Sequence, residues 1–153
     1  MCVTERARSL LDEARAVYDR LGDQRFSARA AVQAGFAWMA DGDNARAASM
    51  ITTSLRSSLE LEDVWGTTEG LEAMAAVRAA QGSPERAART GGAAEVLRET
   101  MTVRPFASDR IWTERYMEEA RASLDARTWQ AAWDAGRALS LEEAVEDALA
   151  SRT

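Results

Sequence analysis

Two similar stretches forty residues apart constrain the fold of this chain more than any other feature. Residues 40–48 read ADGDNARAA, and residues 80–88 read AQGSPERAA. Each stretch has a Gly that can end one helix, a polar residue that can cap the next, and a pair of Ala residues at the same distance. A fixed period of this size is typical of stacked helical hairpins. We therefore expect an all-α chain built from repeats.

Hydrophobic periodicity and capping residues place the helices of the repeats. Asp43 is a good N-cap for the third helix, and Ser83 is expected to cap the fifth, with Pro84 at its first position. Ala47 and Ala87 lie where the two helices of a hairpin are expected to cross closely. A bulky side chain at either position would push the helices apart. The expected helices cover about residues 4–21, 25–40, 43–61 and 64–80, with a fifth from residue 84.

The last third of the chain has a different pattern. Pro105 marks an extended break, and apolar residues then return at helical spacing, with Ser140 and Glu143 forming a capping box before a last helix. The adjacent Gly91 and Gly92 lie inside a helix, where we expect close approach of a tail helix. One structural domain is predicted, with helical repeats over 1–101, an extended linker over 102–107, and a C-terminal helical cap over 108–153 that packs on the repeats.

Composition argues against several classes of function. The net charge of -6 argues against direct binding of nucleic acid by this chain. His and Lys are both absent, which removes the usual general base, a common metal ligand, the Walker A lysine and a Schiff base. One Cys cannot build a zinc site or an internal disulfide, and no apolar run is long enough for a membrane span. We expect a cytoplasmic protein that is not an enzyme and has no metal or cofactor.

The hairpin pattern resembles tetratricopeptide repeats, although with a longer period. The spacing of small and large residues in one copy follows that family, with Trp38 at its aromatic position; the residues are Gly35, Gly42, Ala47, Ile51 and Ser54. The other copy departs from the pattern, with Ala75, Arg78 and Gly91 at corresponding positions. The resemblance implies about eight helices in antiparallel hairpins, stacked as a short right-handed solenoid with a C-terminal cap.

The tail carries a second resemblance. SPERAARTGGAAEVLRET followed by WQAAWDAGRALSLEEAVEDALA is similar to the C-terminal helical-repeat region of large bacterial signalling ATPases and LuxR-type transcriptional regulators. That family combines such repeats with an NTPase domain and often a helix-turn-helix, and neither is present in this sequence. The first hairpin also begins within its second helix, so the chain reads either as a piece of a larger regulator or as a stand-alone relative.

Two candidate sites follow. The resemblance to tetratricopeptide repeats implies a partner-binding groove on the first helix of each hairpin, lined by Arg29, Val32, Phe36 and Met39 and then by Glu69 and Glu72. The second candidate is an apolar pocket near Trp112, Trp129 and Trp133, although Trp residues on apolar helical stripes more often fill a core.

Three functional hypotheses remain open at this point. The first is a protein- or peptide-binding module within transcriptional or signalling machinery. The second is a small-molecule sensor that uses the Trp pocket. The third is an oligomerisation element, in which a second copy covers the apolar face of the incomplete first hairpin and forms a homodimer.

Overall fold

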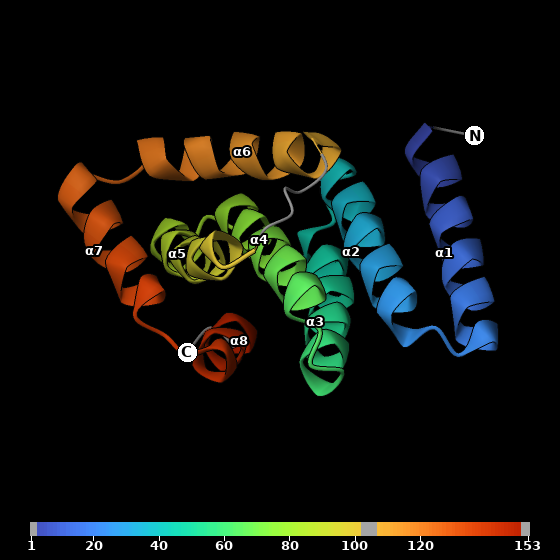
Figure 1. Ribbon diagram of the computed structural model, residues 1–153. Helices are drawn as coiled ribbons and strands as arrows, with labels where there is room; N and C mark the ends of the chain where they lie inside the picture. The colour runs from blue at the N-terminus through green and yellow to red at the C-terminus, as the bar shows by residue number, and fades with distance from the viewer. Residues whose placement is uncertain (1–2, 102–106, 151–153) are drawn as a thin grey trace. The chain divides into compact units, whose positions relative to one another are not determined.

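The computed structural model describes residues 3–101 and 107–150, without the side chains of residues 3, 107–110 and 112. In this part of the chain every regular element is an α-helix, which confirms the prediction of an all-α fold with about eight helices (Figure 1). The helices are α1 (Val3–Leu21), α2 (Gln24–Ala40), α3 (Asn44–Glu60), α4 (Val64–Ala80), α5 (Pro84–Glu99), α6 (Ala107–Ala122), α7 (Ala126–Arg137) and α8 (Leu141–Leu149).

The four turns between α1 and α5 share one backbone hydrogen-bond pattern. At the turn after α2, the Gly42 N–H donates to the Met39 carbonyl at 2.9 Å, and the Asp43 N–H donates to the Trp38 carbonyl at 3.0 Å. The same pair of bonds recurs at residues 22–23, 62–63 and 82–83. This is the Schellman motif, in which the residue after the helix C-cap adopts a left-handed conformation. The turn therefore recurs every twenty residues, and the forty-residue sequence period spans two helices.

Glu62 is the exception among these turns. Its φ is 52°, in the region that glycine occupies in the other three turns. Its side chain is exposed, so replacing it with glycine changes mainly the cost of this backbone conformation. A left-handed conformation costs an L-residue about 1–2 kcal/mol.

We expect Glu62→Gly to stabilise the chain by about 0.5–1 kcal/mol, since Gly relieves this strain but adds entropy to the unfolded chain. Urea unfolding followed by circular dichroism measures the change in free energy. Arg56→Gly, at an exposed position inside α3, is the matched control and should destabilise instead. An equal loss of stability in both variants would contradict this account of the turn.

The helix caps match the expected positions, with one correction. The Asp43 carboxylate accepts a hydrogen bond from the Arg46 N–H at 3.0 Å, and Ser140 and Glu143 form both bonds of the capping box. Ser83 occupies the N-cap of α5, but its side chain makes no capping hydrogen bond. Pro84 at the start of α5 has no N–H to be satisfied and already fixes the backbone for a helix, so this end depends less on a side-chain cap.

The chain forms two compact units, Met1–Gly70 and Leu71–Thr153, which divide inside α4. In the first unit α2 packs against both α1 and α3. Its centre is the crossing of α2 and α3, where Ile51 and Leu55 are fully buried and Gly35 lies against Ile51. Ala47 is also fully buried, in agreement with the expectation that a small residue is needed in this hairpin.

The second unit is organised around α5. This helix packs most extensively against α7 and also contacts α6 and α8, and Figure 1 shows these three helices arranged around it. Ala87 and Ala88 of α5 form a buried cluster with Ala120 and Trp129. Arg78 of α4 holds the end of α8 by donating a hydrogen bond to the Ala148 carbonyl at 2.9 Å.

The predicted domain boundaries are only partly covered by the structure. Residues 102–106 of the expected linker lie outside the described residues, and residue 107 already belongs to α6. The prediction of a single structural domain stays a prediction. Within the described ranges, none of the helices combines the length and apolar character needed to cross a membrane.

Candidate functional site

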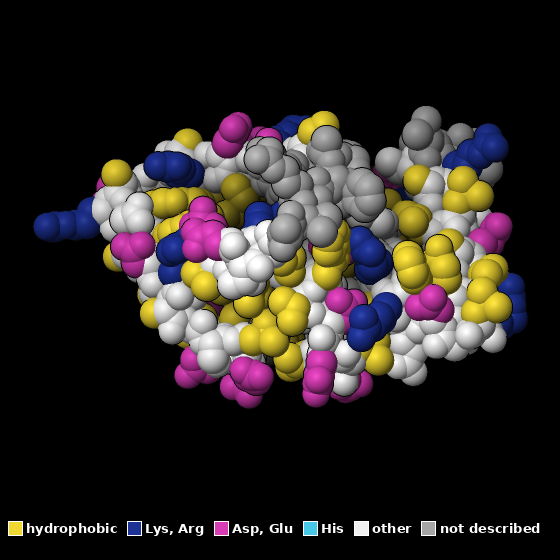
Figure 2. Space-filling view, viewed as in Figure 1, with side chains coloured by type: hydrophobic (Ala, Val, Ile, Leu, Met, Phe, Trp, Pro, Cys, Tyr) yellow, Lys and Arg dark blue, Asp and Glu magenta, His cyan; other side chains and the backbone are white. Residues whose placement is uncertain are grey.

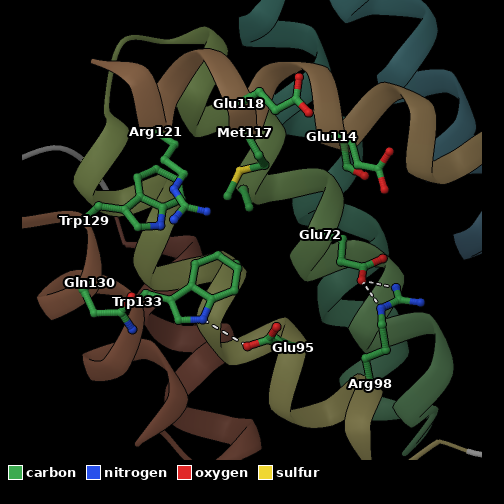
Figure 3. A pocket seen from close by; sticks show the side chains of 13 residues that line it. Glu72, Glu95, Arg98, Glu114, Met117, Glu118, Arg121, Trp129, Gln130 and Trp133 are labelled. Atoms are coloured by element: carbon green, nitrogen blue, oxygen red, sulfur yellow. Dashed lines mark hydrogen bonds and ion pairs between the residues drawn. The ribbon is translucent and has the colours of Figure 1, made fainter. Parts of the chain in front are cut away.

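A cavity of about 470 Å³ lies within the second unit. Its walls come from α4, α5, α6 and α7, and Figure 3 shows the larger side chains around it. The apolar part of the lining is Ala75, Gly91, Met117, Trp129 and Trp133. The polar part is Glu72, Glu95, Arg98, Thr113, Glu114, Glu118, Arg121 and Gln130. A volume of this size falls within the range of pockets that hold small molecules.

The close crossing of α5 and α7 sets the position of the two Trp residues. A Cβ atom on Gly92 would collide with the backbone of Trp133, and one on Gly136 would collide with the carbonyl of Arg89. Each helix therefore needs a glycine where its backbone meets the other helix. This confirms the expectation that Gly92 serves the close approach of a tail helix.

Gly91 has a different role from its neighbour. A Cβ atom there would lie 2.8 Å from the Cζ3 atom of Trp133 and 2.9 Å from the Cε atom of Met117. Both are side-chain atoms of residues that line the cavity. The absence of a side chain at Gly91 therefore leaves room for the cavity wall.

Trp129 and Trp133 form a stacked pair on one side of the cavity. Their ring centroids are 6.0 Å apart with an interplanar angle of 23°. Trp129 is buried, whereas Trp133 is partly exposed. The Trp133 Nε1–H donates a hydrogen bond to Glu95 Oε2 at 3.0 Å, which fixes the indole ring against α5 (Figure 3).

Arg137 of α7 joins this side of the cavity to α5 through two carboxylates. Its Nη1 donates to Glu95 Oε2 at 2.5 Å, and its two terminal nitrogens each donate to Glu99 at 3.0 Å. These hydrogen bonds, with a smaller contribution from the positive charge itself, lower the pKa of the Glu99 carboxyl. Because this pKa is lower in the folded chain, the stabilisation is present at neutral pH and is lost as the pH falls into the acid range.

The opposite wall carries a second ion pair. The Arg98 Nε donates to Glu72 Oε1 at 2.5 Å, and its Nη2 contacts the same carboxylate oxygen. This pair joins α4 to α5 inside the second unit. Glu114 and Glu118 add two further carboxylates from α6, beside Met117 (Figure 3).

The structure places two of the three predicted pocket residues in this cavity. Trp129 and Trp133 both line it, while the side chain of Trp112 lies outside the described residues. Sequence reasoning missed Glu95, Arg98 and Met117. Met117 is one of the apolar residues at helical spacing after Pro105, a pattern that by itself indicates only a core position. Nothing in the spacing indicates that Glu95 meets Trp133, which lies 38 positions further along the chain.

The predicted groove residues have other surroundings. Val32, Phe36 and Met39 are buried, with at most 5% of their surface exposed, so they offer no open apolar surface. Arg29 and Glu69, one repeat apart, form a two-point ion pair at 3.0 and 2.9 Å, and Glu69 also accepts from the Trp65 indole N–H. Glu72 lines the cavity of the second unit instead.

The small size of the neighbouring residues accounts for this burial. Phe36 lies in a helix whose other buried positions are mostly Ala and Gly, and these allow a close approach of the packed helices. The larger side chains of α2 therefore fill the interior rather than project from it.

Comparison with known proteins adds no further assignment. No protein-family model matches the chain, and neither a curated protein nor a solved structure does. In the described ranges, no group of three or more His, Cys, Asp or Glu side chains is arranged to hold a metal ion.

Proposed function

We propose that this chain is a non-enzymatic recognition module that binds a small molecule in the cavity of its second unit. The observation that carries the proposal is the cavity of about 470 Å³ with Trp133 and Met117 in its lining. Aromatic and apolar walls with a few fixed polar groups are the usual composition of ligand pockets. The lack of His and Lys in the sequence supports binding rather than catalysis.

The wider role we propose is that of a sensory or regulatory segment of a bacterial transcription or signalling regulator. The support is the resemblance of the tail sequence to such regulators, together with a cavity built largely by that tail. Binding between α5, α6 and α7 would stabilise their arrangement, because a ligand that binds only the folded unit shifts the equilibrium toward it.

The test is a thermal-shift and Trp-fluorescence screen of the intact chain against pools of amino acids, sugars, nucleosides, amines and organic acids. At least one pool is expected to raise the melting temperature and change the Trp emission. Met117→Ala should weaken that response about tenfold, because it removes an apolar contact from the cavity wall. Ile111→Ala is the matched control, since Ile111 is an apolar residue of the same helix that is 69% exposed and does not line the cavity. A screen in which no pool alters either signal would refute the proposal.

A second candidate function is association through α1. Leu10, Val17 and Leu21 are 56%, 41% and 73% exposed, and their spacing places them along one stripe of the helix. Figure 2 shows hydrophobic side chains on the surface over α1, at the right of the view. An exposed apolar stripe of this kind is a candidate for contact with a protein partner or a second copy. Sedimentation velocity that shows only a monomer at all concentrations would exclude homodimer formation.

A further inference from the structure

We infer that the ligand of the Trp133 cavity is an organic cation with an apolar body. This inference rests on the proposed function, and it adds the chemical class of the ligand. Three features of the second unit support it: the balance of charge around the cavity, the aromatic face of Trp133, and the soft apolar surface of Met117.

The charge around the cavity is negative. Four carboxylates line it and only two guanidinium groups do. Arg98 is paired with Glu72, so its charge is already compensated. Arg137, just outside the lining, is shared between Glu95 and Glu99. Glu114 and Glu118 of α6 contribute two of the lining carboxylates, and Arg121 is the other guanidinium group of the lining. A ligand with a positive charge would complement this excess, whereas an anion would be repelled by it.

Trp133 provides a surface that favours the same charge. The face of an indole ring attracts cations more strongly than any other side-chain ring, and the attraction grows when the cation leaves water. The Trp133 N–H donates to the Glu95 carboxylate, which increases the electron density of the ring. The ring is partly exposed and borders the cavity, so a ligand can reach it.

Met117 and the small residues of the floor determine the rest of the ligand. The Met117 side chain lies near Trp133 at the cavity (Figure 3), and the small residues Ala75 and Gly91 also line it. Met side chains adapt to apolar groups of different shape. A ligand with a compact apolar or aromatic body next to its charge therefore fits this lining better than a polyhydroxylated one.

The experiment compares three probes of similar size and different charge: benzyltrimethylammonium, benzyl alcohol and phenylacetate. Each is titrated into the ¹⁵N-labelled intact chain, and the indole N–H resonance of Trp133, assigned with Trp133→Phe, reports binding. We expect the cation to bind about tenfold more tightly than the neutral alcohol, as a cation over an indole face allows. The anion should bind most weakly. Glu118→Gln should weaken the cation about threefold, and Glu119→Gln should leave it unchanged.

Glu119 is a suitable control because it lies on the same helix, is 66% exposed and pairs with Arg115 rather than lining the cavity. Equal binding of the alcohol and the cation would overturn the inference and leave the proposed function standing. An absence of any Trp133 shift with the cation at millimolar concentration would also overturn it. In that case the metabolite screen decides separately whether the cavity binds another class of ligand.

Discussion

Gly136→Ala should reduce the stability of the second unit by about 2 kcal/mol. The new Cβ atom would collide with the carbonyl of Arg89 on α5, and a backbone atom cannot move aside as a side chain can. Overpacking of this kind costs about 1–3 kcal/mol, and the better helix propensity of Ala returns up to about 1 kcal/mol. The measurement is amide hydrogen exchange of α5 and α7 together with thermal melting by circular dichroism.

Gly91→Ala is the appropriate comparison for this prediction. Its Cβ atom would meet only side-chain atoms, of Trp133 and Met117, and Met117 can adjust. We expect it to destabilise the unit less than Gly136→Ala does and to reduce ligand binding, because it enters the cavity wall. A neutral or stabilising effect of Gly136→Ala would contradict the close approach of the α5 and α7 backbones.

Ile51→Ala should cost the first unit about 2–4 kcal/mol. Ile51 is fully buried at the crossing of α2 and α3, and removal of a buried aliphatic side chain leaves a cavity that the surroundings fill only in part. Urea unfolding of the purified chain, followed by far-ultraviolet circular dichroism, gives the change in free energy. Leu10→Ala, with Leu10 56% exposed on α1, serves as the control and should change stability far less.

The same crossing predicts a coupling between Ile51 and Gly35. A Cβ atom on Gly35 would lie 2.9 Å from Cγ1 of Ile51, so Gly35→Ala alone should destabilise the chain by about 1 kcal/mol. In the Ile51→Ala background that obstacle is gone, and Gly35→Ala should become stabilising by about 1 kcal/mol. The double-mutant cycle therefore predicts a coupling energy of about 2 kcal/mol. Additive effects would contradict direct contact at this crossing.

The local structure of the chain could be predicted well from its sequence. The four turns depend on residues within six positions of one another, such as Gly42 with Asp43 and Gly82 with Ser83, and helix ends are set by such local chemistry. The twenty-residue recurrence was less visible, because Glu62 replaces Gly in one turn and only the backbone reveals that its conformation is the same.

The candidate site could be predicted only in part. Periodicity placed Trp129 and Trp133 on one face of a helix, but it could not show which surface that face would meet. The partners of Trp133 are Glu95 and Gly92, on a helix about forty positions earlier, and their roles depend on how α5 and α7 cross. The same limit applies to the expected groove residue Phe36. Periodicity assigns it to one face of a helix, but it does not show that this face is buried.

In the second unit the adjacent glycines Gly91 and Gly92 have different roles. Gly92 allows the backbone of α7 to come close, and that approach brings Trp133 onto α5. Gly91 makes room for the Trp133 and Met117 side chains, which line the cavity. If the cavity binds a ligand as proposed, variants that loosen the crossing should also weaken that binding.

The most direct test of the central claim is an intermolecular nuclear Overhauser experiment on the intact chain with benzyltrimethylammonium. If the cavity is the binding site, the N-methyl protons of the probe should show contacts to the Met117 methyl group and to the Trp133 ring. These contacts should disappear in Trp133→Ala, provided that its circular dichroism shows the helices intact. Contacts that map instead to the exposed residues of α1, or no contacts at a concentration that saturates binding, would contradict the account.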